Sequence, residues 1–173
     1  MPRPAVCGCW NDPARGKGCG CASDCGYRES GDPGHGDHLQ QPWEKTAREV
    51  RTEIAERRAQ GHGYLLAEED GRVLGFASYK QFRGGPGYAR TGEHSIMLVD
   101  AARGRGVGRT LMSALEDHAR AGGMHSMIAG VSGENPGGVG FHERLGYKRV
   151  AVLPQVGWKF DRWMDLILLQ KCL

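Results

Sequence analysis

The sequence has no long apolar run. No stretch of its 173 residues approaches the length that crosses a bilayer, and the first residues lack the apolar centre of a signal peptide. We therefore expect a soluble, cytoplasmic protein with no membrane partner. The basic excess is also small, since 23 Lys and Arg against 20 Asp and Glu leave a formal charge of +3. That charge is too small to indicate a nucleic-acid partner.

Cysteine is almost missing from most of the chain. Five of the six cysteines lie before residue 26, namely Cys7, Cys9, Cys19, Cys21 and Cys25. Residues 1–42 are also rich in Gly and Pro, show no helix or strand periodicity and hold too few apolar residues for a core. We predict that this segment is disordered and separate from a domain at 43–173. The alternative is a small metal module with His35 and His38, although Cys-x-Cys differs from the Cys-x-x-Cys of zinc knuckles.

From Glu44 onward the patterns are those of a folded domain. Residues 44–60 predict an amphipathic helix with Ala47, Val50 and Ile54 on one face. Strands are predicted at 64–68, 73–82, 93–99, 126–131, 147–153 and 163–170, with further helices at 107–121 and between Asn135 and Gly146. A hairpin turn is indicated by Asp70-Gly71. The order α-β-β-β-α-β-α-β-β predicts an α/β fold with a mixed sheet.

One stretch places glycines and arginines between a strand and a helix. The run Arg103-Gly104-Arg105-Gly106-Val107-Gly108-Arg109 leads into the predicted helix 107–121. Glycines let the main chain approach a ligand, and N–H groups at a helix start attract an anion. An ordinary strand-to-helix loop is the alternative. Because the arginines alternate with the glycines, we predict a site for a phosphate-bearing ligand.

Four further blocks accompany this loop: Thr91–Ile96, Ser132–Pro136, Phe141–Tyr147 and Leu153–Leu166. The loop fits the Q/R-x-x-G-x-G/A pattern of the GNAT superfamily of acetyltransferases. The four blocks resemble its phosphinothricin/methionine sulfone N-acetyltransferase branch. The resemblance runs from about Glu44 to the last residue and implies the GNAT fold, a mixed central sheet flanked by helices. The N-terminal segment lies outside it.

The resemblance implies acetyl-CoA as the cofactor, with its pyrophosphate on the glycine loop. Its pantetheine arm would follow the main chain of the strand before the loop. The start of the last helix would supply Asn135, which also suits a helix N-cap. The implied cofactor residues are Ile96, Met97, Leu98, Arg103, Gly104, Arg105, Gly106, Val107, Gly108, Arg109 and Asn135. No metal is expected at this site.

Acetyl transfer to an amine needs a group that removes the amine's proton. By resemblance this base is Glu93, and the alternative is a solvated residue at a strand end. The second catalytic candidate is His142, which stands where many superfamily members have the tyrosine that protonates the leaving thiolate. A helix-surface histidine is the simpler account of His142. We expect a structural role for His94, because it alternates to the other face of the strand from Glu93.

Two residues of the loop before Glu93 resemble the substrate-contacting segment, Arg83 and Tyr88. An arginine can hold a carboxylate or phosphinate through two hydrogen bonds, and a plain surface charge is the alternative. The branch usually has an aromatic residue in place of Met97. The closing block departs from the commonest residues at Trp158 and Asp161.

We predict an N-acetyltransferase that moves acetyl from acetyl-CoA to a small amino-acid-like amine, within a ternary complex. By resemblance we also expect a homodimer. One alternative is a protein or peptide N-acetyltransferase. The other is a non-catalytic or impaired acetyl-CoA-binding domain.

The family normally has a strand and a helix ahead of the position of Glu44, and this chain has neither pattern there. Codons compatible with Glu29–Gln41, read one nucleotide forward, can encode NPVIRDTGTTFNS, which resembles the family's own sequence at this place. We hypothesise that much of residues 1–42 is translated out of frame, which would impair the acceptor half of the site. The gene's nucleotide sequence tests this, since codons unable to encode the shifted peptide would exclude it.

Overall fold

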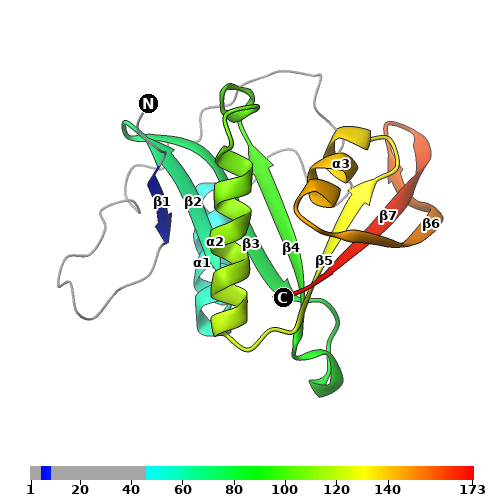
Figure 1. Cartoon of the computed structure of the whole chain (residues 1–173), viewed down its shortest axis with the longest axis horizontal. Coiled ribbons are helices and arrows are strands. Elements are labelled where there is room, and N and C mark those ends of the chain that lie inside the picture. Colours follow the sequence, from blue (N-terminus) through cyan, green and yellow to red (C-terminus); the bar gives the residue numbers. More distant parts are fainter. Residues whose placement is uncertain (1–4, 9–45) are drawn as a thin grey trace. The chain divides into compact units, whose positions relative to one another are not determined.

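The computed structural model describes residues 5–8 and 46–173 (Figure 1). The strands are β1 (Ala5–Gly8), β2 (Tyr64–Glu69), β3 (Arg72–Gln81), β4 (Thr91–Leu98), β5 (Ser126–Ser132), β6 (Lys148–Lys159) and β7 (Arg162–Cys172). The helices are α1 (Ala47–Ala59), α2 (Val107–Ala121) and α3 (Pro136–Arg144), with short 3-10 turns η2 (Pro86–Tyr88) and η3 (Asp100–Ala102). From α1 onward, this order of helices and strands is the predicted one.

The strands form one sheet in the order β1-β2-β3-β4-β5-β7-β6. The pair β4–β5 is parallel. The pairs β1–β2, β2–β3, β5–β7 and β6–β7 are antiparallel. The predicted mixed sheet is therefore confirmed. Within the described residues, no helix has the length and apolar character needed to cross a membrane.

The first of two structural units contains α1, β2, most of β3, the second half of β4, and α2. Its core depends on α2, whose buried residues recur at the predicted helical spacing: Val107, Leu111, Met112, Leu115 and Ala119. Both predicted ends of this helix are confirmed. The predicted hairpin between β2 and β3 is also confirmed, because Asp70 (φ 50°) and Gly71 (φ 77°) have the two positive φ angles of a type I′ turn.

The first helix differs from its prediction in where it starts and in how deeply it packs. A capping box between Thr46 and Glu49 fixes the start of α1, later than the predicted Glu44. None of its residues is fully buried, and the expected apolar face is only half-buried at Val50 and Ile54. Three apolar positions among many charged ones are too few to form a buried stripe.

Gly75 on β3 lies so close to β4 that a side chain does not fit. A Cβ added there would come 2.6 Å from Leu98 Cδ2 and would also meet the carbonyl oxygen of Met97. We expect Gly75→Ala to lower the free energy of unfolding by about 1–3 kcal/mol, measured by urea denaturation. The matched control is Gly84→Ala, because no described atom lies within 4 Å of a Cβ at that position. Equal stability of the two variants would contradict this packing.

The second unit contains the end of β3, the start of β4, β5, α3, β6 and β7. Its β6 is longer than predicted, because it runs to Lys159 and not only to Leu153. A register shift between Leu153 and Gly157 accommodates Pro154. Gln155 there has a φ of 52°, and its N–H donates to Asp165 Oδ1 at 2.9 Å. A bulge that this hydrogen bond stabilises therefore lets β6 continue beyond Pro154.

The N-terminal segment contributes one short strand that the sequence did not predict. Residues Ala5–Gly8 form β1, antiparallel to β2. Four residues are too few to show an alternating pattern. The rest of residues 1–42 lies outside the described residues. Three predictions therefore also lie outside them: the domain boundary at 42/43, the candidate metal ligands other than Cys7, and the frameshift in residues 29–41. Within the described part, no group of three or more His, Cys, Asp or Glu is placed to hold a metal ion.

Candidate active site

The glycine loop turns the chain from η3 into α2. Gly104 (φ 71°) and Gly106 (φ 81°) are both left-handed, and Gly106 is the N-cap of α2, with no side-chain cap. The first hydrogen bond of the helix runs from Thr110 N–H to the Gly106 carbonyl, at 3.1 Å. The N–H groups of Val107, Gly108 and Arg109 therefore stand at the positive end of a 15-residue helix. This arrangement fits a phosphate or pyrophosphate group.

Carboxylates hold two of the three arginines of this loop. Arg103 Nε lies 2.9 Å from Asp100 Oδ1. Arg105 donates to both carboxylate oxygens of Glu69, at 2.7 and 2.9 Å. Within the described part of the chain, Arg109 forms no ion pair. The contact with Glu69, at the end of β2, joins residues far apart in sequence, so no local pattern could predict it.

The last part of β4 carries the predicted pantetheine residues. The ladder with β5 joins Thr91–His94 to Ser126–Ala129 and ends there, while β4 continues to Leu98. Ile96, Met97 and Leu98 are half-buried. On this edge of β4 their main-chain groups are not used by the ladder with β5, so they can hydrogen-bond to a ligand.

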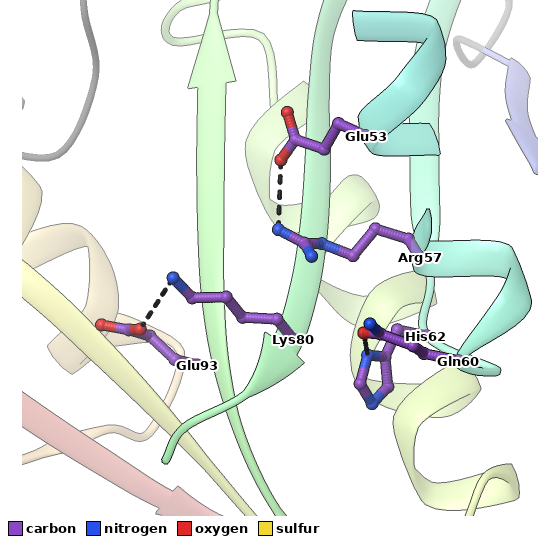
Figure 2. A network of polar contacts seen from close by, with 6 residues as sticks. All are labelled: Glu53, Arg57, Gln60, His62, Lys80 and Glu93. Atoms are coloured by element: carbon purple, nitrogen blue, oxygen red, sulfur yellow. Dashed lines mark hydrogen bonds and ion pairs between the residues drawn. The ribbon is translucent and has the colours of Figure 1, made fainter. Parts of the chain in front are cut away.

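Glu93 is paired with a lysine from the neighbouring strand. The Phe82 N–H donates to the Thr91 carbonyl at 2.9 Å, which makes these ends of β3 and β4 antiparallel. Two residues further along each strand, Lys80 lies opposite Glu93 on the same face. Lys80 Nζ lies 3.6 Å from Glu93 Oε2, with 48% of the lysine side chain and 13% of the glutamate side chain exposed (Figure 2). Local sequence patterns do not identify Lys80 as a partner of Glu93, because this pairing depends on the strand register.

His94 and His142 form a buried pair. Their Nε2 atoms lie 3.0 Å apart, and His142 Nδ1 lies 2.7 Å from the Gly138 carbonyl. A carbonyl only accepts, so His142 Nδ1 is the donor in that contact. One of the two Nε2 atoms therefore carries the hydrogen that the other accepts. Burial, with a smaller contribution from His142, lowers the pKa of His94 to about 3.

This pair corrects one expectation about His142. It is 6% exposed, so the account of it as a helix-surface histidine is wrong. The rings of His94, His142 and Tyr147 pack together, with centroids 5.1 to 5.5 Å apart. Because its Nε2 contacts His94, the geometry favours a packing role for His142 over a proton donor. The burial of His94 agrees with the structural role expected for it.

The two predicted substrate residues lie on the loop between β3 and β4. Arg83 is exposed, with its guanidinium carbon 5.5 Å from the centre of the Phe82 ring. Tyr88, at the end of η2, is 47% exposed. The Gln81 side-chain amide donates to the Arg83 carbonyl at 2.5 Å and fixes the start of the loop. Among the described contacts, none joins Arg83 or Tyr88 to Glu93.

Asn135 begins α3 as its N-cap. Its Oδ1 accepts from the Gly138 N–H at 2.7 Å. The capping role considered from the sequence is therefore present. The Nδ2 group of the same amide is a donor that capping does not use, so a contact with a cofactor remains compatible with the cap.

Comparison with known proteins places this geometry in a family. The model of the acetyltransferase (GNAT) family matches residues 30–147, more than half of the chain. The chain belongs to this family. The match includes the glycine loop, Glu93 and the start of α3. It begins at residue 30, whereas the resemblance was expected to begin at about Glu44.

Individual GNAT proteins agree with this assignment. An L-methionine sulfoximine/L-methionine sulfone acetyltransferase from Salmonella typhimurium is 43% identical over 110 residues. The alignment covers 64% of this chain and 64% of that relative, so the chain spans less than two thirds of the relative's length. The predicted resemblance to this branch of the GNAT superfamily is confirmed.

Solved structures show the same fold. A ribosomal-protein-alanine N-acetyltransferase from Brucella melitensis has a TM-score of 0.72 and 36% identity, covering 75% of this chain and 80% of that one. A GNAT superfamily phosphinothricin acetyltransferase from Sinorhizobium meliloti, in complex with acetyl-CoA, has a TM-score of 0.70 and 31% identity. It covers 75% of this chain and 70% of that one. The predicted GNAT fold is confirmed.

Proposed function

We propose that this GNAT chain is an acetyl-CoA-dependent N-acetyltransferase for a small amino-acid-like amine, of the methionine sulfone or phosphinothricin type. The observation that carries the proposal is the uncapped N-terminus of α2 behind its glycine loop. A diphosphate suits this anion site, and the 43% identical relative is named as a methionine sulfone acetyltransferase.

The residues present fit acetyl-CoA. The free N–H groups of Val107, Gly108 and Arg109 would hold the pyrophosphate. Positive charge would come from the Arg109 side chain, which has no ion pair among the described residues, and from Arg103 and Arg105 where they turn from Asp100 and Glu69. The main chain of Ile96–Leu98 would bind the pantetheine arm, and Asn135 Nδ2 would donate to the cofactor. When bound, the cofactor supplies an acetyl group activated as a thioester.

The acceptor amine reacts only after it loses a proton, because the ammonium form has no lone pair. We assign the removal of that proton to the carboxylate of Glu93. A main-chain N–H of Ile96–Leu98 would stabilise the negative charge that develops on the carbonyl oxygen during the transfer. Arg83 and Tyr88 stay in the proposal as contacts to the far end of the acceptor. His142 is proposed as a packing residue.

A screen of acceptors tests this function. The full chain is mixed with acetyl-CoA and either methionine sulfone, phosphinothricin or a peptide with an N-terminal alanine, and thiol release is measured. We expect turnover with the two amino-acid analogues and little with the peptide. Turnover of the peptide alone would favour a protein N-acetyltransferase, a candidate that the Brucella melitensis relative supports. Binding of acetyl-CoA without turnover would favour a non-catalytic domain.

A homodimer in the cytoplasm is part of the same proposal. The hairpin of β6 and β7 leaves several large apolar side chains exposed, and β6 is an edge strand of the sheet. These side chains are Val150, Val152, Val156, Trp158, Phe160 and Trp163. An apolar sheet edge of this kind suits association. Light scattering after gel filtration measures the oligomeric state, and cell fractionation measures the location.

A further inference from the structure

We propose that Lys80 and Glu93 together bind the two charged groups of a free α-amino acid. In this arrangement the substrate's amino group lies at the Glu93 carboxylate and its α-carboxylate lies at the Lys80 ammonium. The inference rests on the proposed function, because it takes Glu93 as the residue that receives the amine. It adds a residue that selects the class of acceptor.

The spacing of the pair matches the substrate. Lys80 Nζ and Glu93 Oε2 are 3.6 Å apart. In an α-amino acid, the amino nitrogen and the carboxylate carbon are two bonds apart, about 2.5 Å. A substrate lying alongside the pair therefore places a positive group at Glu93 and a negative group at Lys80 together. Opposite charges then alternate around the four groups, and each contact is favourable.

The exposure of the two side chains suits their separate tasks. The Glu93 side chain is mostly covered, at 13% exposed, which holds its carboxylate in one place. The Lys80 side chain is 48% exposed. An ammonium has three donors, so Lys80 can stay near Glu93 and still bind a second carboxylate. Figure 2 shows Lys80 extending from β3 toward Glu93, where the partly exposed ammonium meets the carboxylate.

The other cation considered for this task lies elsewhere. Arg83 was expected to hold the acid group of the substrate, but its guanidinium stacks near Phe82, and no described contact brings it to Glu93. Lys80 is the cation that the strand register fixes opposite the predicted base. An amino acid whose amine lies at Glu93 therefore has Lys80 as the cation beside its α-carboxylate.

This assignment separates free amino acids from peptides. The N-terminal amine of a peptide is followed by an uncharged amide in place of a carboxylate. An amide can accept a hydrogen bond from Lys80, but it carries no charge to attract it. We therefore expect Lys80 to favour free amino acids over peptide N-termini, whatever the side chain of the acceptor.

The test compares methionine sulfone with its carboxamide, which has the same amine and no carboxylate. We measure kcat/KM for both acceptors in the full chain, Lys80→Met, Lys80→Arg and the control Lys148→Met, which removes an exposed lysine of β6. In Lys80→Met the preference for the acid over the amide is expected to fall about 10- to 100-fold. Lys80→Arg keeps most of the preference, and Lys148→Met keeps all of it. The ratio cancels any effect of Lys80 on Glu93 itself, because both acceptors use the same base.

Calorimetric titration with methionine sulfone is the second measurement, and it needs no turnover. Weaker binding to Lys80→Met than to Lys148→Met supports the inference, even if the wild type fails to acetylate and the proposed function falls. A normal rate in the wild type with an unchanged acid-to-amide ratio in Lys80→Met overturns the inference and leaves the proposed function standing. So does equal binding of methionine sulfone by the two variants.

Discussion

Glu93→Gln is expected to lower kcat with methionine sulfone by about 10²- to 10⁴-fold, the usual contribution of a general base. Glutamine has nearly the same shape as glutamate but does not take the amine's proton. The ion pair with the half-exposed Lys80 contributes at most about 1 kcal/mol to stability, so the variant should fold. Thiol release gives the rate, and a titration with acetyl-CoA shows whether cofactor binding is kept.

The pH dependence of this variant makes the test sharper. Raising the pH converts more of the free substrate to the neutral amine, which needs no base. The deficit of Glu93→Gln relative to the wild type should therefore shrink as the pH rises. Glu56→Gln is the control, because it removes an exposed carboxylate from α1. An unchanged kcat in Glu93→Gln would show that Glu93 is not the base.

The second large effect is the loss of stability in acid through His94. Its pKa is about 3 in the folded chain and 6.5 when unperturbed. Between these values the unfolded chain binds a proton that the folded chain excludes. The free energy of unfolding should therefore fall as the pH drops from about 6.5 toward about 3, by up to about 1.4 kcal/mol per pH unit. Burial also lowers the pKa of His62 and of His118, which adds to the slope in the same direction.

His94→Gln separates this contribution from the others. The amide can still donate to His142 but does not titrate, so the slope between pH 4 and pH 6.5 should flatten by about one proton. At pH 7 the variant should be about 1–3 kcal/mol less stable, because the ring packing with His142 and Tyr147 is lost. His125→Gln serves as the control, since His125 is exposed. Urea denaturation across the pH range measures both effects, and equal slopes in the wild type and His94→Gln would contradict this account.

Local patterns predicted the elements whose residues determine them directly. Helix α2 has a continuous apolar stripe, and the β2–β3 turn has its Asp-Gly signal. Contacts between distant residues were not predicted. Lys80 meets Glu93, Glu69 meets Arg105 and His94 meets His142 only after the strands and helices are aligned. The surface position considered for His142 was wrong for the same reason, because the packing of α3 decides which of its residues are buried.

The strand boundaries that were predicted wrongly also have physical causes. The predicted end of a strand at Leu153 was wrong, because the bulge before Gly157 lets β6 continue to Lys159. Strand β1 is too short to show alternation. For the proposed site, the glycine loop was predicted from its residue pattern, and Asn135 from the resemblance to the GNAT superfamily. The contacts between loop residues and distant side chains, such as Arg105 with Glu69, could be identified only from the folded structure.

One measurement tests the central claim most directly. The full chain is incubated with acetyl-CoA and methionine sulfone, and the products are quantified by mass spectrometry. We expect one N-acetylmethionine sulfone for each CoA released, with the acetyl group on the amino nitrogen. Intact acetyl-CoA and unmodified methionine sulfone after prolonged incubation, together with normal binding of acetyl-CoA to the chain, would contradict it.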